Sequence, residues 1–215
     1  MISTVGVGGT QFNSRPFSRR CPISVKSASA QYRKSGIGVK SQVYSGVHDS
    51  PVAQLALADA DQTRQLGISL SSQAKPGDFI GLIGELGAGK TTMMQGVVAA
   101  IDDSDRWQAT SPTYALMQVY ETRPPIFHID LYRLEGWSDL ESIGYWDAVE
   151  SGRGISCVEW LNRIPGAWPG RGLIVELERN ANRRVARLWA DDDWAQRIES
   201  LELSSPDQSA NRELS

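Results

Sequence analysis

The sequence contains only two cysteines, Cys21 and Cys157, among 215 residues. They are too few and too far apart for a disulfide framework or a zinc site, which favours a reducing compartment. Long hydrophobic runs are also absent, because no uninterrupted apolar stretch approaches the roughly 20 residues that a membrane-spanning helix needs. The hydrophobic region of a secretory signal is missing as well. We therefore expect a cytoplasmic protein without a membrane partner.

Acidic residues are absent from the first 48 positions, which hold seven lysines and arginines. The rest of the chain then carries 15 basic residues against 25 acidic ones, a net charge of −10. Affinity for nucleic acid rests largely on lysine and arginine side chains that neutralise phosphates. The acidic part of the chain is therefore a poor candidate for direct nucleic-acid binding, and a protein partner fits it better.

Residues 1–50 are rich in serine, glycine and arginine and show no hydrophobic periodicity, so we expect them to be disordered. Their composition also matches an organelle transit peptide, which gives a plastid or another organelle as the alternative location. An unstructured extension or an over-long gene model is the other interpretation. We expect a single folded domain over residues 51–203 and a polar tail over residues 204–215.

Hydrophobic spacing within the domain predicts a mixture of strands and helices. A helix over 61–72 is expected to be capped by Asp59 or Asp61, and the capping-box pattern Ser138-Asp-Leu-Glu141 to open a helix that reaches about Val149. A third helix is predicted over 90–101, and strands over 52–58, 78–84, 114–120, 126–132, 155–159, 173–178 and 184–190. This order predicts an α/β fold, one small domain whose sheet is covered by helices on both faces.

The most specific motif is GELGAGKT at residues 84–91, which fits the phosphate-binding pattern G-x-x-x-x-G-K-[ST] at every fixed position. Glycines allow the backbone N–H groups to wrap a phosphate, and the following helix adds its positive N-terminus. Lys90 is expected to reach the β- and γ-phosphates, and the Thr91 hydroxyl to bind Mg²⁺. The residues expected to contact the nucleotide are Leu86, Gly87, Ala88, Gly89, Lys90, Thr91 and Thr92.

Sequence motifs that accompany such a loop in some nucleotide-binding proteins are absent, and their absence narrows the class of nucleotide-binding protein. There is no Asn-Lys-x-Asp, the element with which GTPases read guanine, and no LSGGQ-like stretch as in ABC transporter subunits. A domain of this size also leaves little room for the lid and acceptor site of a kinase. A phosphate loop after an apolar strand and before a helix predicts a P-loop NTPase-type sheet.

Two acidic residues stand at the ends of apolar segments. Asp130 lies within His128-Ile-Asp-Leu-Tyr132, where a buried acid is costly unless it is paired or faces a metal; an edge position facing water is the alternative. Glu159 ends the segment ISCV, at the kind of strand end where α/β enzymes place metal-associated acids. His128 is treated as a packing residue or as a support behind the site.

Five motifs in order resemble the TsaE family, formerly called YjeE: GELGAGKTT, SPTYALMQVYE, HIDLYRLE, LESIGYWD and CVEW. The resemblance covers about residues 52–190. It implies a small Mg²⁺-dependent ATPase needed to form threonylcarbamoyladenosine at position 37 of tRNAs that read ANN codons. It also implies TsaD and TsaB as partners: ATP hydrolysis, slow alone and stimulated by the TsaD–TsaB complex, supports repeated turnover, and tRNA is contacted only through that complex.

The resemblance assigns roles to individual residues. Thr113 would lie near the γ-phosphate and the metal in a switch-like loop, and Asp130 would stand at the catalytic centre together with Lys90. Glu159 would bind Mg²⁺ alongside Thr91, and Trp160 would lie near the nucleotide. One departure is that Leu161-Asn162 follows this tryptophan, where relatives commonly have proline and an acidic or amide residue.

Some residues and two rival functions stay open at this point. The roles of Asn162 and Arg133 are not fixed, and the late arginines Arg183, Arg184 and Arg187 either contact the nucleotide or form a solvated strand face. One rival function is a small-molecule kinase, which predicts ADP release that depends on an acceptor. The other is a binding module that changes shape with its nucleotide without hydrolysing it, and such a module needs neither Asp130 nor Glu159.

Overall fold

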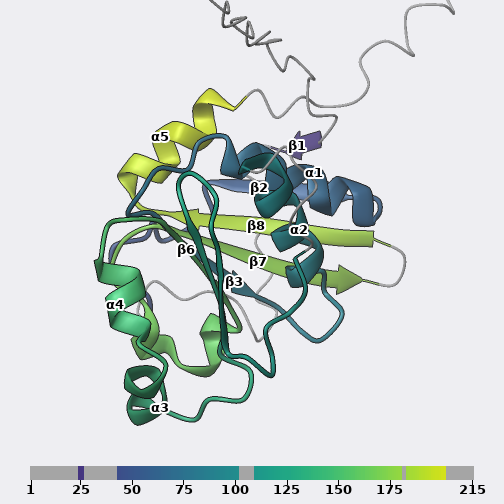
Figure 1. The fold of residues 1–215 in the computed structure, drawn as a ribbon. Coiled ribbons are helices and arrows are strands. Elements are labelled where there is room, and N and C mark those ends of the chain that lie inside the picture. The colour runs from purple at the N-terminus through teal and green to yellow at the C-terminus, as the bar shows by residue number, and fades with distance from the viewer. Residues whose placement is uncertain (1–23, 27–42, 102–108, 181–182, 202–215) are drawn as a thin grey trace, which may run out of the picture.

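The computed structural model describes residues 24–26, 43–101, 109–180 and 183–201. Over these residues eight strands form one sheet in the order β1-β2-β8-β7-β3-β6-β5-β4 (Figure 1). The central strands β7, β3, β6 and β5 are parallel, and the strands on both sides of them pair antiparallel. Within the described ranges, each helix is too short or too polar to cross a membrane.

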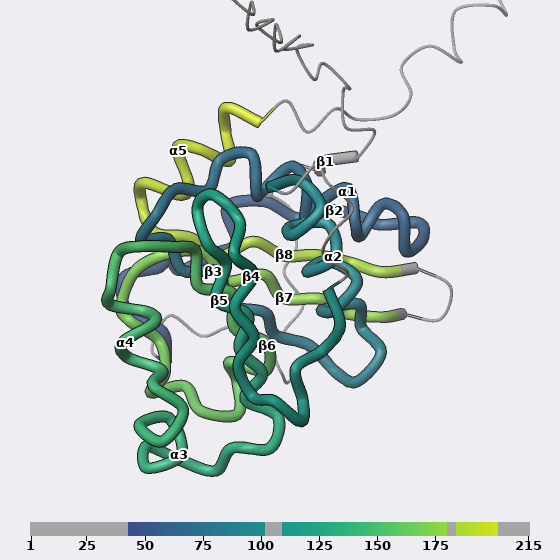
Figure 2. The backbone as a smooth tube through the Cα atoms, viewed as in Figure 1, coloured from purple at the N-terminus to yellow at the C-terminus, as the bar shows by residue number. Residues whose placement is uncertain are grey.

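The strands are β1 Ser24–Lys26, β2 Ala53–Leu57, β3 Phe79–Ile83, β4 Met117–Tyr120, β5 Ile126–Asp130, β6 Ile155–Glu159, β7 Leu173–Asn180 and β8 Arg183–Ala190. The helices are α1 Ala60–Ser71, α2 Lys90–Ile101, α3 Trp137–Ser142, α4 Tyr145–Glu150 and α5 Asp192–Ser200. Two 3₁₀ turns, η1 Leu161–Arg163 and η2 Pro165–Ala167, follow β6. Figure 2 traces the path of the chain through these elements.

Strand β3 shows why the sheet is covered on both faces. All five of its residues are buried. Ile80 and Leu82 point to the core beneath α1, α2 and α5, while Phe79 and Ile83 point to a second core beneath α3, α4 and the two 3₁₀ turns. An apolar run buried on both faces is typical of a central parallel strand. The prediction of an α/β sheet with helices on both faces is confirmed.

Helices α1 and α2 pack together closely, which fixes where α2 begins. Asp59 caps α1 by accepting a hydrogen bond from the Gln62 amide at 2.8 Å, so the first of the two predicted caps is the real one. At the crossing, a Cβ atom on Gly96 would overlap the carbonyl oxygen of Arg64. Glycine therefore lets the helices approach to backbone contact, and α2 is held at one position on the sheet.

The strand predicted over 114–120 is shorter in the structure. Residues 114–116 form a turn, with Leu116 in the left-handed region at φ 64°, and β4 begins only at Met117. The carbonyl of Leu116 accepts a hydrogen bond from the Asp130 amide at 2.9 Å. The turn places residues 111–113 across the end of β5. This tertiary contact decides the conformation here, although the apolar pattern favours a strand.

The helix predicted from Ser138 to about Val149 is two helices. The chain leaves α3 at Ile143 and re-enters a helix after Gly144, which adopts a left-handed φ of 68°. Gly136, rather than Ser138, is the N-cap of α3, and no side chain caps this end. The predicted capping box is therefore wrong.

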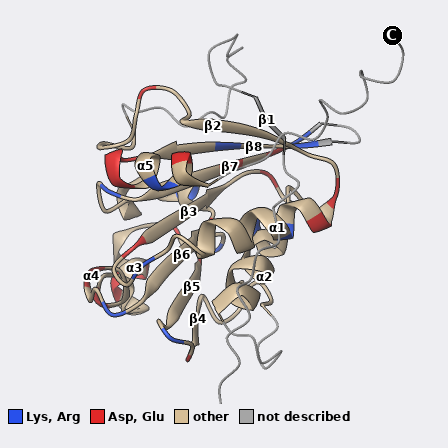
Figure 3. Cartoon of the chain, turned by 90° about the horizontal axis from the view of Figure 1, so that it is seen from above, with Lys and Arg blue, Asp and Glu red and all other residues tan. Residues whose placement is uncertain are grey.

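Helix α5 was not predicted. Asp191 caps it by accepting from the Trp194 amide at 2.9 Å, and acidic residues fill its first turn (Figure 3). Trp194 and Ile198 are buried against the core. Arg197 is held between Asp78 and Asp193, with an oxygen of each at 2.6 Å, and so ties the helix to the start of β3.

Residues just before Pro51 pack on the domain. Tyr44 is 3% exposed, and its ring meets the Trp168 ring edge-on at 6.1 Å between centroids. The Trp168 indole N–H donates to the carbonyl of Ser45 at 2.7 Å, and β1 pairs with β2. The packed part of the chain therefore begins upstream of residue 51. The rest of the predicted extension and the predicted tail lie outside the described residues.

We expect Tyr44→Ala to destabilise the domain, because the substitution empties a buried aromatic site. The loss should be about 3 kcal/mol of unfolding free energy, seen as a fall of several degrees in the thermal midpoint. Val43→Ala is the matched control, since Val43 is exposed and its truncation should change little. Equal midpoints for the two variants would show that this segment does not contribute to the core.

Candidate functional site

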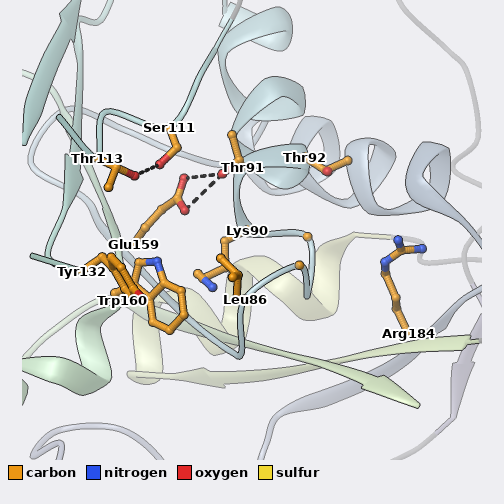
Figure 4. Close-up of a pocket in the computed structure, with 12 residues that line it drawn as sticks. Leu86, Lys90, Thr91, Thr92, Ser111, Thr113, Tyr132, Glu159, Trp160 and Arg184 are labelled. Atoms are coloured by element: carbon orange, nitrogen blue, oxygen red, sulfur yellow. Dashed lines mark hydrogen bonds between the residues drawn. The ribbon is translucent and has the colours of Figure 1, made fainter. Parts of the chain in front are cut away.

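Three parallel strands end at one edge of the sheet and bring the candidate residues together. β3 leads into the phosphate loop, β5 ends at Asp130 and β6 ends at Glu159, and the register pairs Asp130 with Glu159 and Leu82 with Glu159. They border a cavity of about 330 Å³ (Figure 4). It is lined by Leu86, Gly87, Gly89, Lys90, Thr91, Thr92, Ser111, Thr113, Tyr132, Glu159, Trp160 and Arg184.

The loop adopts a shape that only glycine accommodates. Gly84, Gly87 and Gly89 have φ values of 147°, 77° and 114°, which side chains disfavour. A Cβ atom on Gly84 would also overlap the carbonyl oxygen of Leu177 on β7. The pattern of glycines therefore reflects the backbone path, which ends at the N-terminus of α2.

Lys90 is a buried cation held by the loop itself. Its ammonium donates to the carbonyls of Gly84 at 2.8 Å and Glu85 at 3.0 Å, and it lies 3.5 Å from the centroid of the Trp160 ring. Burial lowers the pKa of Lys90 to about 8, although the nearby carboxylates of Glu159 and Asp130 act in the opposite direction. The site thus holds a poorly solvated positive charge that an anion can stabilise.

Glu159 joins the loop to the sheet through a chain of hydrogen bonds. The Thr91 hydroxyl lies 3.2 and 3.3 Å from its two carboxylate oxygens, and His128 Nε2 lies 2.9 Å from Oε1. On its other side, His128 Nδ1 is 3.4 Å from the Tyr120 hydroxyl. His128 is completely buried, so it acts as a support that orients the carboxylate, one of the two roles left open by the sequence.

Asp130 lies directly behind the cavity and does not line it. It is fully buried, and its Oδ2 accepts hydrogen bonds from Ser111 at 2.6 Å and Thr113 at 2.7 Å. Its Oδ1 accepts from the Tyr132 amide at 2.8 Å. The edge-strand alternative is therefore wrong, and the carboxylate fixes the 111–113 loop so that its two hydroxyl-bearing residues face the cavity.

Two aromatic residues close the other side of the cavity. Trp160 adopts a left-handed φ of 61° at the start of η1, and its ring meets that of Tyr132 at 4.8 Å between centroids. Tyr132 was not predicted as a site residue. The signal in the sequence was its position two residues after Asp130, but an aromatic residue in an apolar segment usually belongs to the core.

The remaining candidate residues differ in whether they line the cavity. Of the residues predicted to contact the nucleotide, Leu86 and Thr92 line the cavity. Ala88 does not: its side chain is in the core and its amide donates to Glu85 at 3.1 Å. Neither Asn162 nor Arg133 lines the cavity.

The three arginines of β8 also differ in their surroundings. Arg184 lines the cavity, whereas Arg187 is paired with Glu178 at 2.8 Å and Glu176 at 3.6 Å. Nothing is described for the side chain of Arg183.

The donor set fits a metal that is shared with a phosphate. In the described ranges no group of three or more histidine, cysteine or acidic residues is arranged to hold a metal alone. Mg²⁺ is usually bound by one or two carboxylates together with phosphates and water. Thr91 and Glu159, with oxygens facing each other at the edge of the cavity, supply that kind of partial set.

Comparison with known proteins identifies the family. The family model described as threonylcarbamoyl adenosine biosynthesis protein TsaE matches residues 57–186, which is more than half of the chain. The chain belongs to the TsaE family. The match contains every residue that lines the cavity, from Leu86 to Arg184.

Individual members of the TsaE family are similar over the same region. The tRNA threonylcarbamoyladenosine biosynthesis protein TsaE of Nostoc sp. is 39% identical over 118 residues, covering 53% of this chain and 71% of the relative. The Synechocystis protein of the same name is 36% identical, covering 51% and 70%. The crystal structure of Bacillus subtilis YdiB matches with a TM-score of 0.57 at 24% identity, over 69% of this chain and 93% of that chain, and thus supports the fold.

We expect Asp130→Ala to release the 111–113 loop, because Ser111 and Thr113 lose the acceptor that holds them. Amide hydrogen exchange in residues 110–116 should become at least tenfold faster, while exchange in α2 stays unchanged. Asp147→Ala removes an exposed acid from α4 and serves as the control. An unchanged exchange rate in the loop would show that these hydrogen bonds do not hold it.

Proposed function

We propose that the protein is a Mg²⁺-dependent ATPase that serves tRNA threonylcarbamoyladenosine biosynthesis by supporting repeated turnover of the TsaD–TsaB complex. Membership of the TsaE family supports the pathway. The observation that carries the ATPase is the cavity in which the phosphate loop, Lys90 and the Thr91–Glu159 pair converge. The second buried acid, Asp130, fixes the 111–113 loop beside the same cavity.

Binding of the phosphates is the task of the loop and Lys90. The glycine-rich backbone directs N–H groups of the loop and of the α2 N-terminus into the cavity, where they stabilise negative charge. The Lys90 ammonium exchanges the carbonyls of Gly84 and Glu85 for phosphate oxygens. Because that ammonium is already desolvated, its interaction with a phosphate is strong.

Thr91 and Glu159 would hold the Mg²⁺ ion, which when bound neutralises charge on the β- and γ-phosphates. His128 keeps the Glu159 carboxylate in place by hydrogen bonding to Oε1 from the buried side. The carboxylate can therefore present its oxygens toward Thr91 without side-chain rearrangement. Prior orientation of this kind reduces the reorganisation needed in the transition state.

Asp130 acts through the loop that it fixes. With Ser111 and Thr113 held at their hydroxyls, the Thr113 side chain faces the cavity, where it can orient the water that attacks the γ-phosphorus. In hydrolysis the water oxygen bonds to the γ-phosphorus while the bond from that phosphorus to the ADP oxygen breaks. Of the two protons of the water, one stays on the inorganic phosphate, HPO₄²⁻, and the other is released to solvent. Loops that contact a γ-phosphate commonly order and disorder with the nucleotide state.

The partner proposal rests on surface and charge. Leu86, which lines the cavity, and Tyr114, next to Thr113, are 83% and 91% exposed and are available to a partner. A partner protein that covers these two side chains contacts the phosphate loop on one side and the 111–113 segment on the other. The acidic balance of the chain after residue 48 disfavours direct tRNA contact, so tRNA is reached through TsaD and TsaB.

Lys90→Ala tests the ATPase. The variant should hydrolyse ATP at least a hundredfold more slowly, because the positive charge at the β- and γ-phosphates is lost. Its thermal midpoint should stay near that of the parent, because the loop glycines and the other residues of α2 are untouched. Lys75→Ala, a lysine on the loop before β3, is the control. If Lys90→Ala hydrolyses ATP at the parental rate, the assignment of the cavity is wrong.

A reconstituted reaction tests the pathway. Purified TsaD and TsaB, supplied with tRNA and the threonylcarbamoyl donor, should form about one threonylcarbamoyladenosine per TsaD without this protein and many when it is added with ATP. Lys90→Ala should not restore the further rounds. If the count per TsaD is the same with and without this protein, the proposed role in turnover is excluded, whatever its ATPase rate.

A further inference from the structure

Arg184 is a cation at the end of an apolar row. Side chains of a strand alternate between faces, so Arg184 shares its face with Ala186, Leu188 and Ala190. Those three residues are buried in the core beneath α1 and α2. Arg184 continues the row to the point where the core ends and the cavity begins.

Among the described residues, no counterion is paired with this arginine. Its neighbours across the sheet are Leu57 on β2 and Arg179 on β7, and like charges directly opposite each other destabilise a sheet. Within the described part of the chain Arg184 forms no ion pair, and its buried Nε has no hydrogen-bond partner. By contrast, the guanidinium of Arg187 on the same strand is paired with Glu178, although its own Nε also has no hydrogen-bond partner. A buried donor without an acceptor is costly, which points to a ligand that supplies one.

The position of Arg184 relative to the loop indicates which ligand atoms it meets. A Cβ atom on Gly89 would lie 3.7 Å from Arg184 Nε, so the arginine lies against the phosphate loop. Figure 4 shows it on the side of Thr92, across the loop from Trp160. Thr91 and Glu159 mark the end of the cavity where the metal and the γ-phosphate would bind. The end of the cavity at Arg184 therefore receives the opposite part of the nucleotide.

We propose that Arg184 binds the α-phosphate of the nucleotide. This inference rests on the proposed function and adds a subsite to it. A guanidinium presents several donors in a planar fork that matches phosphate oxygens. Both ATP and ADP carry an α-phosphate, so Arg184 contributes equally to the binding of each. It holds the nucleotide before and after hydrolysis, whereas Thr91, Glu159 and Thr113 respond to the γ-phosphate.

The test compares dissociation constants of ADP and of a non-hydrolysable ATP analogue, measured by calorimetry on the full chain with Mg²⁺. Arg184→Ala should weaken both about tenfold to a hundredfold, the range for loss of a charged hydrogen bond. The ratio of the two constants should not change. Arg179→Ala, which removes the same charge from the exposed residue directly opposite, should leave both constants within about twofold.

Two further arms separate the α-phosphate from the base and from the γ-phosphate. Arg184→Ala should weaken ADP and GDP by the same factor, because the α-phosphate is common to both, and Arg184→Lys should recover part of the loss. A loss confined to one base, or to the ATP analogue alone, would overturn the assignment to the α-phosphate. So would unchanged binding by Arg184→Ala at an unchanged thermal midpoint.

If Arg184→Ala lowers the thermal midpoint, the binding measurements are repeated with Arg184→Gln, which keeps much of the length and polarity of the side chain. This variant should still weaken the binding of ADP and of the ATP analogue by the same factor. Parental affinity in a folded Arg184→Gln variant would overturn the subsite. If the parent itself binds neither nucleotide, the proposed function fails first, and the result for Arg184 fails with it.

Discussion

Two carboxylates buried side by side impose the main constraint on this molecule. Asp130 and Glu159 end neighbouring strands and are paired in register, so two negative charges stand together at the edge of the sheet with almost no exposure to water. Burial on this scale is tolerated only when the charges are satisfied by hydrogen bonds. The loop at 111–113, the Tyr132 amide, Thr91 and His128 provide these bonds. Much of the site is therefore arranged around the two acids, and Lys90 contributes the nearest positive charge.

Prediction of the structure from sequence succeeded where the local pattern and the fold agree. The run before the loop is apolar at every position and became β3, and the helix over 90–101 was predicted to the residue because the motif fixes its start. It failed where distant contacts decide the structure. The turn at 114–116 exists because Asp130 must be reached, and the packing of Tyr44 depends on Trp168, more than a hundred residues away. No spacing rule in either segment indicates such a partner.

The same distinction holds within the site. Lys90 and Thr91 follow from the motif, because each has a fixed place relative to the glycines. The position of Asp130 one step behind the cavity does not follow, since a buried acid that reacts and one that fixes a loop look alike in sequence. The places of the Ala88 and Tyr132 side chains relative to the cavity do not follow either: within a loop or a strand end, the side-chain direction depends on backbone angles that residue types only partly determine. Arg184 needed the register of β8 with β7 and β2 before its lack of a counterion became visible.

The internal contacts of Lys90 bear on which anions the proposed nucleotide site accepts. Its ammonium is engaged by two carbonyls of its own loop and covered by the Trp160 ring, so it does not project freely into solvent. An incoming anion must compete with these internal contacts, and a small ion that reaches the lysine alone gains little beyond what it replaces. A polyphosphate that engages the loop amides, Thr91 and the lysine together gains several contacts for the same displacement. Under the proposed function, occupancy of the site therefore depends on the number of phosphate groups that reach it at once.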